Sequence, residues 1–230
     1  MNKHQKILLT LFARHPDYLL RLFFTYYPLS NEQIGKFKGE IKWGHLSSNS
    51  VRIWDQSFIE KFADKLNWDT LSANPSLPWS ISFLKAFPDR FNGFIQSSNP
   101  SLPWSYDFIT KYEQFWNFHA LTFNKGITWT QELILHPKIV DKNLSEVNGE
   151  NLWTEEFLIQ NANILPWEFL CANRYIKWSE KLIDTLSPFW KKAEKKTIEY
   201  MVSPWKGLSS NPSVPWTTKL IKKYQKSFFR

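Results

Sequence analysis

The sequence predicts an all-α fold, an α-solenoid of seven helical repeats that each span about 25 residues. The first observation behind this prediction is that an asparagine precedes a tryptophan by five residues at seven places. The seven pairs are Asn49 and Trp54, Asn74 and Trp79, Asn99 and Trp104, Asn124 and Trp129, Asn148 and Trp153, Asn173 and Trp178, and Asn211 and Trp216. Successive tryptophans are 25, 25, 25, 24, 25 and 38 residues apart, so one supersecondary unit recurs along most of the chain.

The second observation is a helix start in the same column of every repeat. The residue after each repeat tryptophan has a side-chain oxygen that can accept a hydrogen bond from an unpaired N–H of a first helical turn. These residues are Asp55, Ser80, Ser105, Thr130, Thr154, Ser179 and Thr217. Apolar residues follow four, five, eight and twelve positions after the tryptophan, with Asp141 as an exception in the last column. This spacing predicts a helix with one buried face.

A second, shorter helix completes each repeat, as from Trp68 to Ala73 and from Trp205 to Ser210. An Asn-Pro pair ends it in several copies. Because the residue before a proline avoids the α conformation, Asn74, Asn99 and Asn211 are predicted to be extended residues of tight turns. Two short helices cannot bury their own apolar faces, so each repeat must stack on its neighbours.

The recurring wording L-S-x-N-P-S-L-P-W-S-x-x-F-I resembles leucine-rich repeat variant and HEAT-like arrays, in which a short helix, an Asn-Pro turn and a longer helix recur at about this length. The resemblance covers Trp43 to Phe228 and implies an α-solenoid. Tryptophan stands where those arrays usually have a small or aliphatic residue. The resemblance implies no activity.

Residues 1–42 are predicted to form an N-terminal helical cap, and residues 43–230 the tandem repeats. In the cap, an apolar segment from Tyr18 to Tyr27 is stopped by Pro28, and Ser30 with Gln33 matches a capping box that starts another helix. The first of these helices is apolar around nearly its whole circumference. It is either sandwiched inside the protein or part of a partner contact, and we favour the sandwiched position.

The chain has 13 tryptophans, which could form a stacking platform for nucleic-acid bases or sugars. All of them fit the repeat: beside the seven paired with asparagine, there are Trp43, Trp68, Trp167 and Trp205 at repeat starts and Trp116 and Trp190 in the last apolar column. Core residues recur between repeats, whereas ligand-contacting residues vary. We therefore interpret the tryptophans as core residues.

The positive charge is concentrated at the two ends of the chain. Residues 1–42 carry a net charge of +4, residues 43–189 carry −4, and residues 190–230 carry +8. The basic C-terminal part also contains the one long spacing, an insertion near residues 191–203 that is either functional or only a lengthened, solvated helix. Residues 217–230 are predicted to form a basic C-terminal cap. The candidate interaction residues are Lys191, Lys192, Lys195, Lys196, Lys222 and Lys223.

The sequence contains no recognisable catalytic, phosphate-binding or metal-binding motif. The histidines lack metal-ligand spacing, and Cys171 lies in a column that elsewhere holds serine, which indicates a buried packing residue. We therefore expect no enzymatic activity, no cofactor and no metal. One enzymatic alternative is a HEAT-like DNA glycosylase, but we identify no aspartate in a basic, aromatic groove that could serve it.

The lone cysteine favours a reducing compartment, and the apolar run from Ile7 to Ala13 is too short for a membrane helix and lacks a cleavage site. We therefore expect a cytoplasmic protein with no membrane contact and no evident small-molecule substrate. The predicted function is a non-enzymatic, repeat-type protein-interaction or structural module with an unidentified protein partner. The alternative is a nucleic-acid-binding solenoid that uses the basic C-terminal region.

Overall fold

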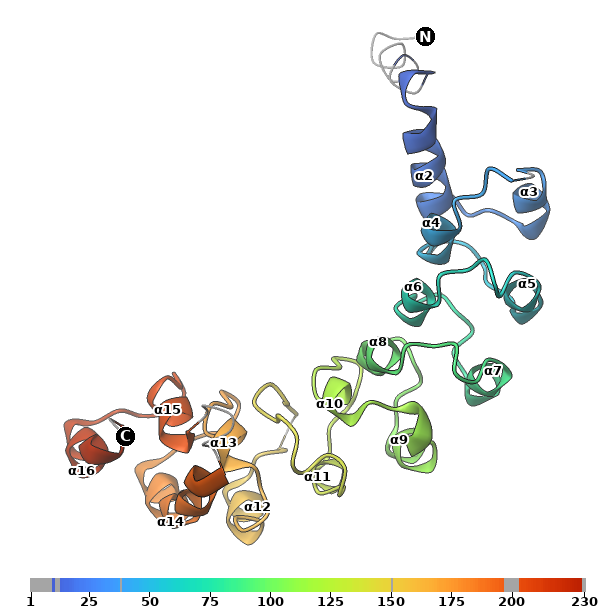
Figure 1. Ribbon diagram of the computed structural model, residues 1–230. Coiled ribbons are helices and arrows are strands. Elements are labelled where there is room, and N and C mark those ends of the chain that lie inside the picture. The colour runs from blue at the N-terminus through green and yellow to red at the C-terminus, as the bar shows by residue number, and fades with distance from the viewer. Residues whose placement is uncertain (1–9, 11–12, 38, 150, 197–202, 229–230) are drawn as a thin grey trace. The chain divides into compact units, whose positions relative to one another are not determined.

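The computed structural model describes residues 10, 13–37, 39–149, 151–196 and 203–228 (Figure 1). Within these ranges the secondary structure is helical, with no strand. The all-α prediction is confirmed for this part of the chain. The chain divides into two compact units, Met1–Trp116 and Asn117–Arg230, and each is described separately below.

The first unit consists of short helices in two layers. Its elements are α2 (Pro16–Tyr26), α3 (Asn31–Gly35), α4 (Trp43–Ser47), α5 (Gln56–Lys61), α6 (Trp68–Ser72), α7 (Ile81–Ala86), α8 (Gly93–Ser98), α9 (Tyr106–Lys111) and a 3-10 turn, η1 (Glu113–Phe115). Helices α2, α4, α6 and α8 contact one another in that order. Helices α3, α5, α7 and α9 form a second row beside α4, α6 and α8 (Figure 1).

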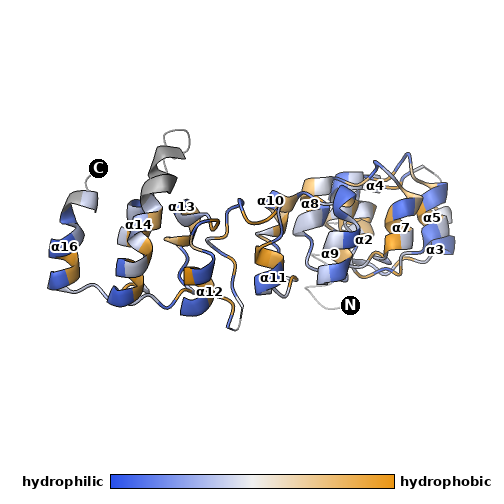
Figure 2. Cartoon of the chain, turned by 90° about the horizontal axis from the view of Figure 1, so that it is seen from below, coloured by the Kyte–Doolittle hydropathy of each residue, from blue (hydrophilic) through white to orange (hydrophobic). Residues whose placement is uncertain are grey.

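The second unit contains α10 (Phe118–Leu121), α11 (Gln131–Ile134), α12 (Glu155–Gln160), α13 (Trp167–Leu170), α14 (Glu180–Lys196), α15 (Pro204–Ser209) and α16 (Thr218–Phe228). Helix α13 packs against α14 and α15, α14 also packs against α12, and α15 packs against α16. Figure 2 shows hydrophobic and hydrophilic residues on different sides of helices such as α11, α12 and α16. The apolar sides meet between the layers, where the core lies.

The predicted helix start is confirmed in all seven repeats. In each case the side-chain oxygen of the residue after the repeat tryptophan accepts a hydrogen bond from the backbone N–H three residues later, at 2.8 to 3.2 Å. The acceptors are Asp55, Ser80, Ser105, Thr130, Thr154, Ser179 and Thr217. These bonds satisfy N–H groups that the first helical turn leaves without a partner.

The apolar columns form the core, with one correction in the last helix. Residues five positions after the tryptophan, such as Ile59, Ile109 and Ile183, are fully buried, but the equivalent Ile221 in α16 is 47% exposed. Helix α16 buries Leu220 and leaves Ile221 on the side that α14 and α15 do not cover. The column five positions after the tryptophan predicts that Ile221 points inward, and for this residue the prediction is wrong.

The N-terminal segment confirms one prediction and corrects another. Ser30 Oγ accepts from Gln33 N at 3.2 Å and Gln33 Oε1 accepts from Ser30 N at 2.8 Å, which completes the predicted capping box. Helix α2 is not sandwiched, because the described residues leave Tyr18 60% and Tyr26 69% exposed. It packs on α4 along one side only, and Phe24 is its buried residue.

Candidate functional site

The repeated asparagines connect one repeat to the preceding one through their side-chain amides. In the first unit, Asn74 Nδ2 donates to the carbonyl oxygens of Ser47 at 2.8 Å and Asn49 at 3.0 Å. One repeat later, Asn99 Nδ2 donates to the carbonyl oxygens of Ser72 at 3.0 Å and Asn74 at 3.4 Å. We call this series of bonds the asparagine ladder.

The same ladder recurs in the second unit. Asn173 Nδ2 donates to the carbonyl oxygens of Leu144 at 2.8 Å and Val147 at 2.9 Å. Asn211 Nδ2 donates to the carbonyl oxygens of Cys171 at 3.0 Å and Asn173 at 2.9 Å. Both asparagine side chains are buried, so each bond satisfies polar groups that are removed from water.

The spacing of five between asparagine and tryptophan has a direct cause in the first unit. The indole Nε1 of Trp54, Trp79 and Trp104 donates to the carbonyl oxygen of the asparagine five residues earlier, at 2.8 to 2.9 Å. The side-chain oxygen of each asparagine also accepts from the backbone N–H two residues later. The predicted turn role is confirmed, and the ladder is an additional role that sequence reasoning missed.

At least two of the seven predicted pairs depart from this arrangement. The indole Nε1 of Trp178 is buried without a hydrogen-bond partner, and the pair of Asn148 and Trp153 is shifted in register. Asn148 is exposed, and the carbonyl oxygen of Val147 accepts from Trp153 Nε1 at 2.9 Å and from Asn173 Nδ2 at 2.9 Å. A main-chain carbonyl serves as acceptor whatever its side chain, so the register shifts by one residue here. The spacing of 24 residues between Trp129 and Trp153 was the sequence signal of this shift.

Helix α2 takes the place of a preceding repeat. Asn49 Nδ2 donates to the carbonyl oxygens of Phe24 and Tyr27, each at 2.8 Å. The carbonyl oxygens at the end of α2 therefore accept from Asn49 in the same way as those of Ser47 and Asn49 accept from Asn74.

The tryptophans are shielded from solvent to different degrees. Eight are buried and the other five are half-buried, namely Trp43, Trp68, Trp79, Trp104 and Trp216. Aromatic neighbours surround them, as where the Trp190 ring lies 4.8 Å from Trp205 and 6.1 Å from Trp178. Core packing thus occupies these rings, which agrees with their interpretation as core residues.

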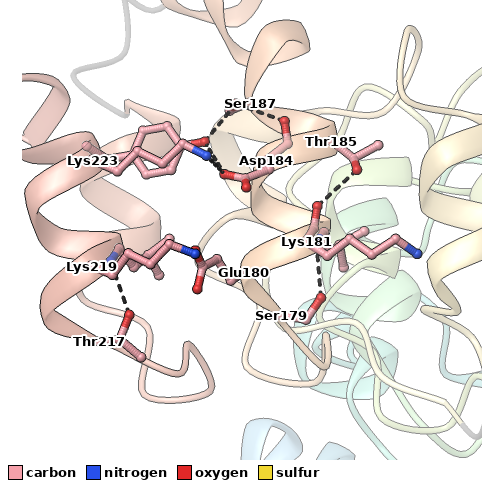
Figure 3. Close-up of polar contacts among 12 residues, drawn as sticks. Ser179, Glu180, Lys181, Asp184, Thr185, Ser187, Thr217, Lys219 and Lys223 are labelled. Carbon is pink, nitrogen blue, oxygen red and sulfur yellow. Dashed lines mark hydrogen bonds and ion pairs between the residues drawn. The ribbon is translucent and has the colours of Figure 1, made fainter.

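Among the six candidate lysines, the structure describes the side chains of two. Lys223 Nζ donates to Asp184 Oδ1 at 2.6 Å (Figure 3). The neighbouring Lys222 is exposed. Lys191, Lys192, Lys195 and Lys196 lie in the last part of α14, and their side chains are outside the described residues, as are insertion residues 197–202 and terminal residues 229–230.

The ion pair of Lys223 and Asp184 is part of a larger polar contact between α14 and α16. A second ion pair joins Lys219 Nζ to Glu180 Oε1 at 2.7 Å, one turn away (Figure 3). Tyr224 Oη donates to Asp184 Oδ1 at 2.7 Å. Hydrogen bonds from Lys223 and then Tyr224 hold the pKa of Asp184 below its usual value, and the bond to Asp184 raises the pKa of Lys223. Burial and then the bond to Asp184 raise the pKa of Tyr224.

A groove in the first unit was missed by the sequence reasoning. It has a volume of about 390 Å³ and is lined by Pro28, Leu29, Ser30, Asn31, Val51, Ile53 and Asp55. Ile53 is 90% exposed and Val51 is 51% exposed at its edge. The available signal was the sequence N-S-V-R-I-W at 49–54, which replaces the N-P-S-L-P-W of 74–79 and 99–104.

Arg52 is the buried residue of this first-repeat loop. It occupies the column of Leu77, and its guanidinium lies 4.4 Å from the Trp54 ring centre and 4.1 Å from that of Phe58. Arg52 Nη2 donates to Asn31 Oδ1 at 2.7 Å, while Nε and Nη1 are buried without a hydrogen-bond partner. Burial lowers the pKa of Arg52 to about 10, against the opposing effect of the Asp55 carboxylate.

The side chains that could carry metal or thiol chemistry are dispersed or buried in the described part of the chain. No group of three or more histidine, cysteine or acidic side chains gathers there as it would around a metal. Cys171 is fully buried, and burial raises the pKa of its thiol well above the usual value, which disfavours the nucleophilic thiolate. In the portion of the chain that is described, every helix is too short or too polar to span a bilayer.

No protein-family model, curated protein or solved structure matches this chain. The resemblance to leucine-rich repeat variant and HEAT-like arrays is therefore supported only by the recurrence of helices and caps within the chain itself.

Proposed function

We propose that the chain is an α-solenoid of seven repeats and that it acts as a non-enzymatic module binding a protein partner. The repeat assignment is supported by the seven equivalent helix caps and by the asparagine ladder within each unit. The lone buried Cys171 is consistent with a reducing, cytoplasmic location.

The observation that carries the binding proposal is the exposed apolar edge of the groove in the first unit. Val51 and Ile53 border this groove and are exposed by 51% and 90%, and Tyr27, which directly precedes the lining residue Pro28, is exposed by 47%. The column of Ile53 holds Pro78, Pro103, Thr128, Leu152, Lys177 and Pro215 elsewhere, and Leu152 is buried. Grouped apolar side chains beside a groove mark interaction surfaces, whereas isolated ones do not.

The chemistry of this surface indicates its partner. Aliphatic and aromatic side chains bury apolar area, so the partner segment is itself apolar, with polar groups facing Ser30, Asn31 and Asp55 at the groove. Apolar burial is not screened by salt. Binding should therefore persist at ionic strengths at which complexes held only by charged groups dissociate.

Site-specific crosslinking tests this proposal. A photoreactive residue at position 53 should capture a defined partner from a lysate of the source organism, also at about 0.5 M salt. A reactive residue at position 164 is the control, because Ile164 is also an exposed isoleucine, at 56%. With the captured partner purified, the Val51→Ser/Ile53→Ser variant should bind at least about tenfold more weakly, and Ile164→Ser should bind as the native chain does. Equal capture from both positions would contradict the proposal.

The nucleic-acid alternative has less support. Two of the basic side chains on α16, Lys219 and Lys223, already pair with carboxylates of α14, so they are less available to phosphates. Lys222 is exposed and stays a candidate contact.

A further inference from the structure

We propose that α16 is a salt-sensitive latch, which detaches from α14 and α15 while the rest of the second unit stays folded, and which thereby uncovers Trp205. This proposal concerns a different unit from the partner surface above and does not depend on it.

The described side chains of α16 provide a small apolar attachment. Leu220 is its fully buried residue among those described, and Ile221 is 47% exposed. The neighbouring α14 buries Leu182, Ile183 and Leu186. Because apolar burial is the main favourable contribution to helix docking, the described side chains of α16 contribute less to its docking than those of α14 do to theirs.

Two ion pairs add to this attachment. Lys219 pairs with Glu180 at 2.7 Å, with side-chain exposures of 79% and 31%, and Lys223 pairs with Asp184 at 2.6 Å, with exposures of 47% and 36%. Both pairs join α16 to α14 (Figure 3). Pairs this exposed are screened by salt, so their contribution falls as ionic strength rises.

The surface beneath the latch is aromatic. The ring of Tyr224 in α16 lies 4.7 Å from the ring of Trp205 in α15, and Trp205 is only 6% exposed. On its other side Trp205 contacts Trp190 at 4.8 Å. Detachment of α16 removes Tyr224 from the Trp205 ring and leaves the carboxylates of Glu180 and Asp184 without their partners on α16.

The connection before α16 stays in place when the helix leaves. Asn211 is bonded to the carbonyl oxygens of Cys171 and Asn173, which anchors the turn that follows α15. The hinge therefore lies after this turn, close to Thr217, whose side chain caps α16 through Leu220 N. Local opening of a helix that is held by few buried side chains is a common low-energy fluctuation.

Hydrogen exchange on the whole chain tests the latch. Raising the salt concentration from about 0.05 M to about 1 M should speed exchange of the α16 amides about three- to tenfold, while exchange in α12 and α13 stays the same. The Lys219→Met/Lys223→Met variant should exchange faster in α16 at low salt and lose the salt response. Lys222→Met is the matched control on the same helix, because the described residues show no ion pair for Lys222, and it should retain that response.

Two results would overturn the proposal. The first is α16 exchange that is independent of salt in the native chain. The second is exchange of α16 only together with α13 and α14, which would mean that the helix leaves only when the whole unit unfolds. A double variant that still folds, as judged by unchanged exchange in α12, but keeps the native salt response would equally reject the role of the two ion pairs.

Discussion

The side-chain amide of Asn74 donates to the main-chain carbonyl of Asn49, 25 residues earlier, at 3.0 Å. The same carbonyl accepts from the indole of Trp54 at 2.8 Å. One buried acceptor thus joins the turn of its own repeat to the following repeat. A buried carbonyl that loses its hydrogen-bond partners costs free energy of folding. The contributions of Asn74 and Trp54 to stability therefore depend on each other.

Removal of a ladder asparagine should destabilise the protein, whereas removal of the exposed asparagine should not. Asn173→Ala deletes the donor to Leu144 and Val147 and should cost about 2 to 3 kcal/mol. Asn148→Ala, in the same unit and also paired with a tryptophan in sequence, should change stability by less than about 0.5 kcal/mol. Urea unfolding measures both. Equal losses would show that the ladder does not distinguish the two positions.

Replacement of Arg52 by the residue of its column should stabilise the first unit. Arg52→Leu removes a buried charge in which two nitrogens, Nε and Nη1, lack a hydrogen-bond partner, and we expect a gain of about 1 kcal/mol after the loss of its ring contacts and the Asn31 bond. Thermal unfolding of the variant measures the effect. Arg90→Leu is the control, since Arg90 is exposed and paired with Asp64. A lower melting temperature for Arg52→Leu would mean that the ring contacts outweigh the desolvation of the charge.

The tryptophans should differ in their contributions according to burial. Trp190→Ala removes a fully buried ring that touches Trp167, Trp178 and Trp205, and should cost about 4 to 5 kcal/mol. Trp79→Ala removes a half-buried ring and should cost about 3 kcal/mol. Chemical denaturation distinguishes these values. An unchanged stability for Trp79→Ala would revive the interpretation of that ring as a stacking surface.

Docking of α16 should depend on pH at both extremes. The pKa of Asp184 is lowered, so its contribution is complete above its unfolded value near 3.8 and is lost as pH falls through the folded pKa. The pKa values of Lys223 and Tyr224 are raised from 10.5 and 10.0, so their contributions are complete below those values and are lost as pH rises through the folded pKa values. The other charged groups that act on Asp184 and Lys223 are Lys219 and Glu180.

The Trp205 indole signal in NMR spectra reports this docking, because the Tyr224 ring lies against it. It should be constant between about pH 5 and about pH 9 and should shift outside that range. Asp184→Asn should remove the acidic transition and leave the alkaline one in part. If the Trp205 signal of the Asp184→Asn variant shifts at low pH as it does in the native chain, the transition belongs to another carboxylate.

Nucleic-acid affinity should be weak at physiological salt, at about 0.15 M. If the chain nevertheless binds duplex DNA, replacing Lys191, Lys192, Lys195, Lys196, Lys222 and Lys223 with serine should reduce the salt slope of binding by roughly 0.9 per lost phosphate contact. Because Lys223 is paired with Asp184, its single replacement should change that slope less than replacement of Lys222. Sub-micromolar binding that disappears in the six-lysine variant would favour the nucleic-acid alternative.

Local chemistry made much of the fold predictable from the sequence. Each helix start requires a side-chain oxygen beside its own first turn, so Ser80, Thr154 and Ser179 indicate caps without knowledge of their surroundings. The Ser30 and Gln33 capping box is equally local. Repetition of these signals at a near-constant spacing then predicted two helices per repeat.

The sequence alone thus determined the helices, their caps and the Asn-Pro turns, because those depend on residues within a few positions of one another. Only the tertiary structure decided that Asn148 lies outside the ladder, that Arg52 is buried in a leucine column, and that Lys223 pairs with Asp184. These outcomes depend on which carbonyl, ring or carboxylate arrives from a neighbouring repeat. Partners separated by 25 to 40 residues are selected by packing, which the periodic pattern does not encode for individual side chains.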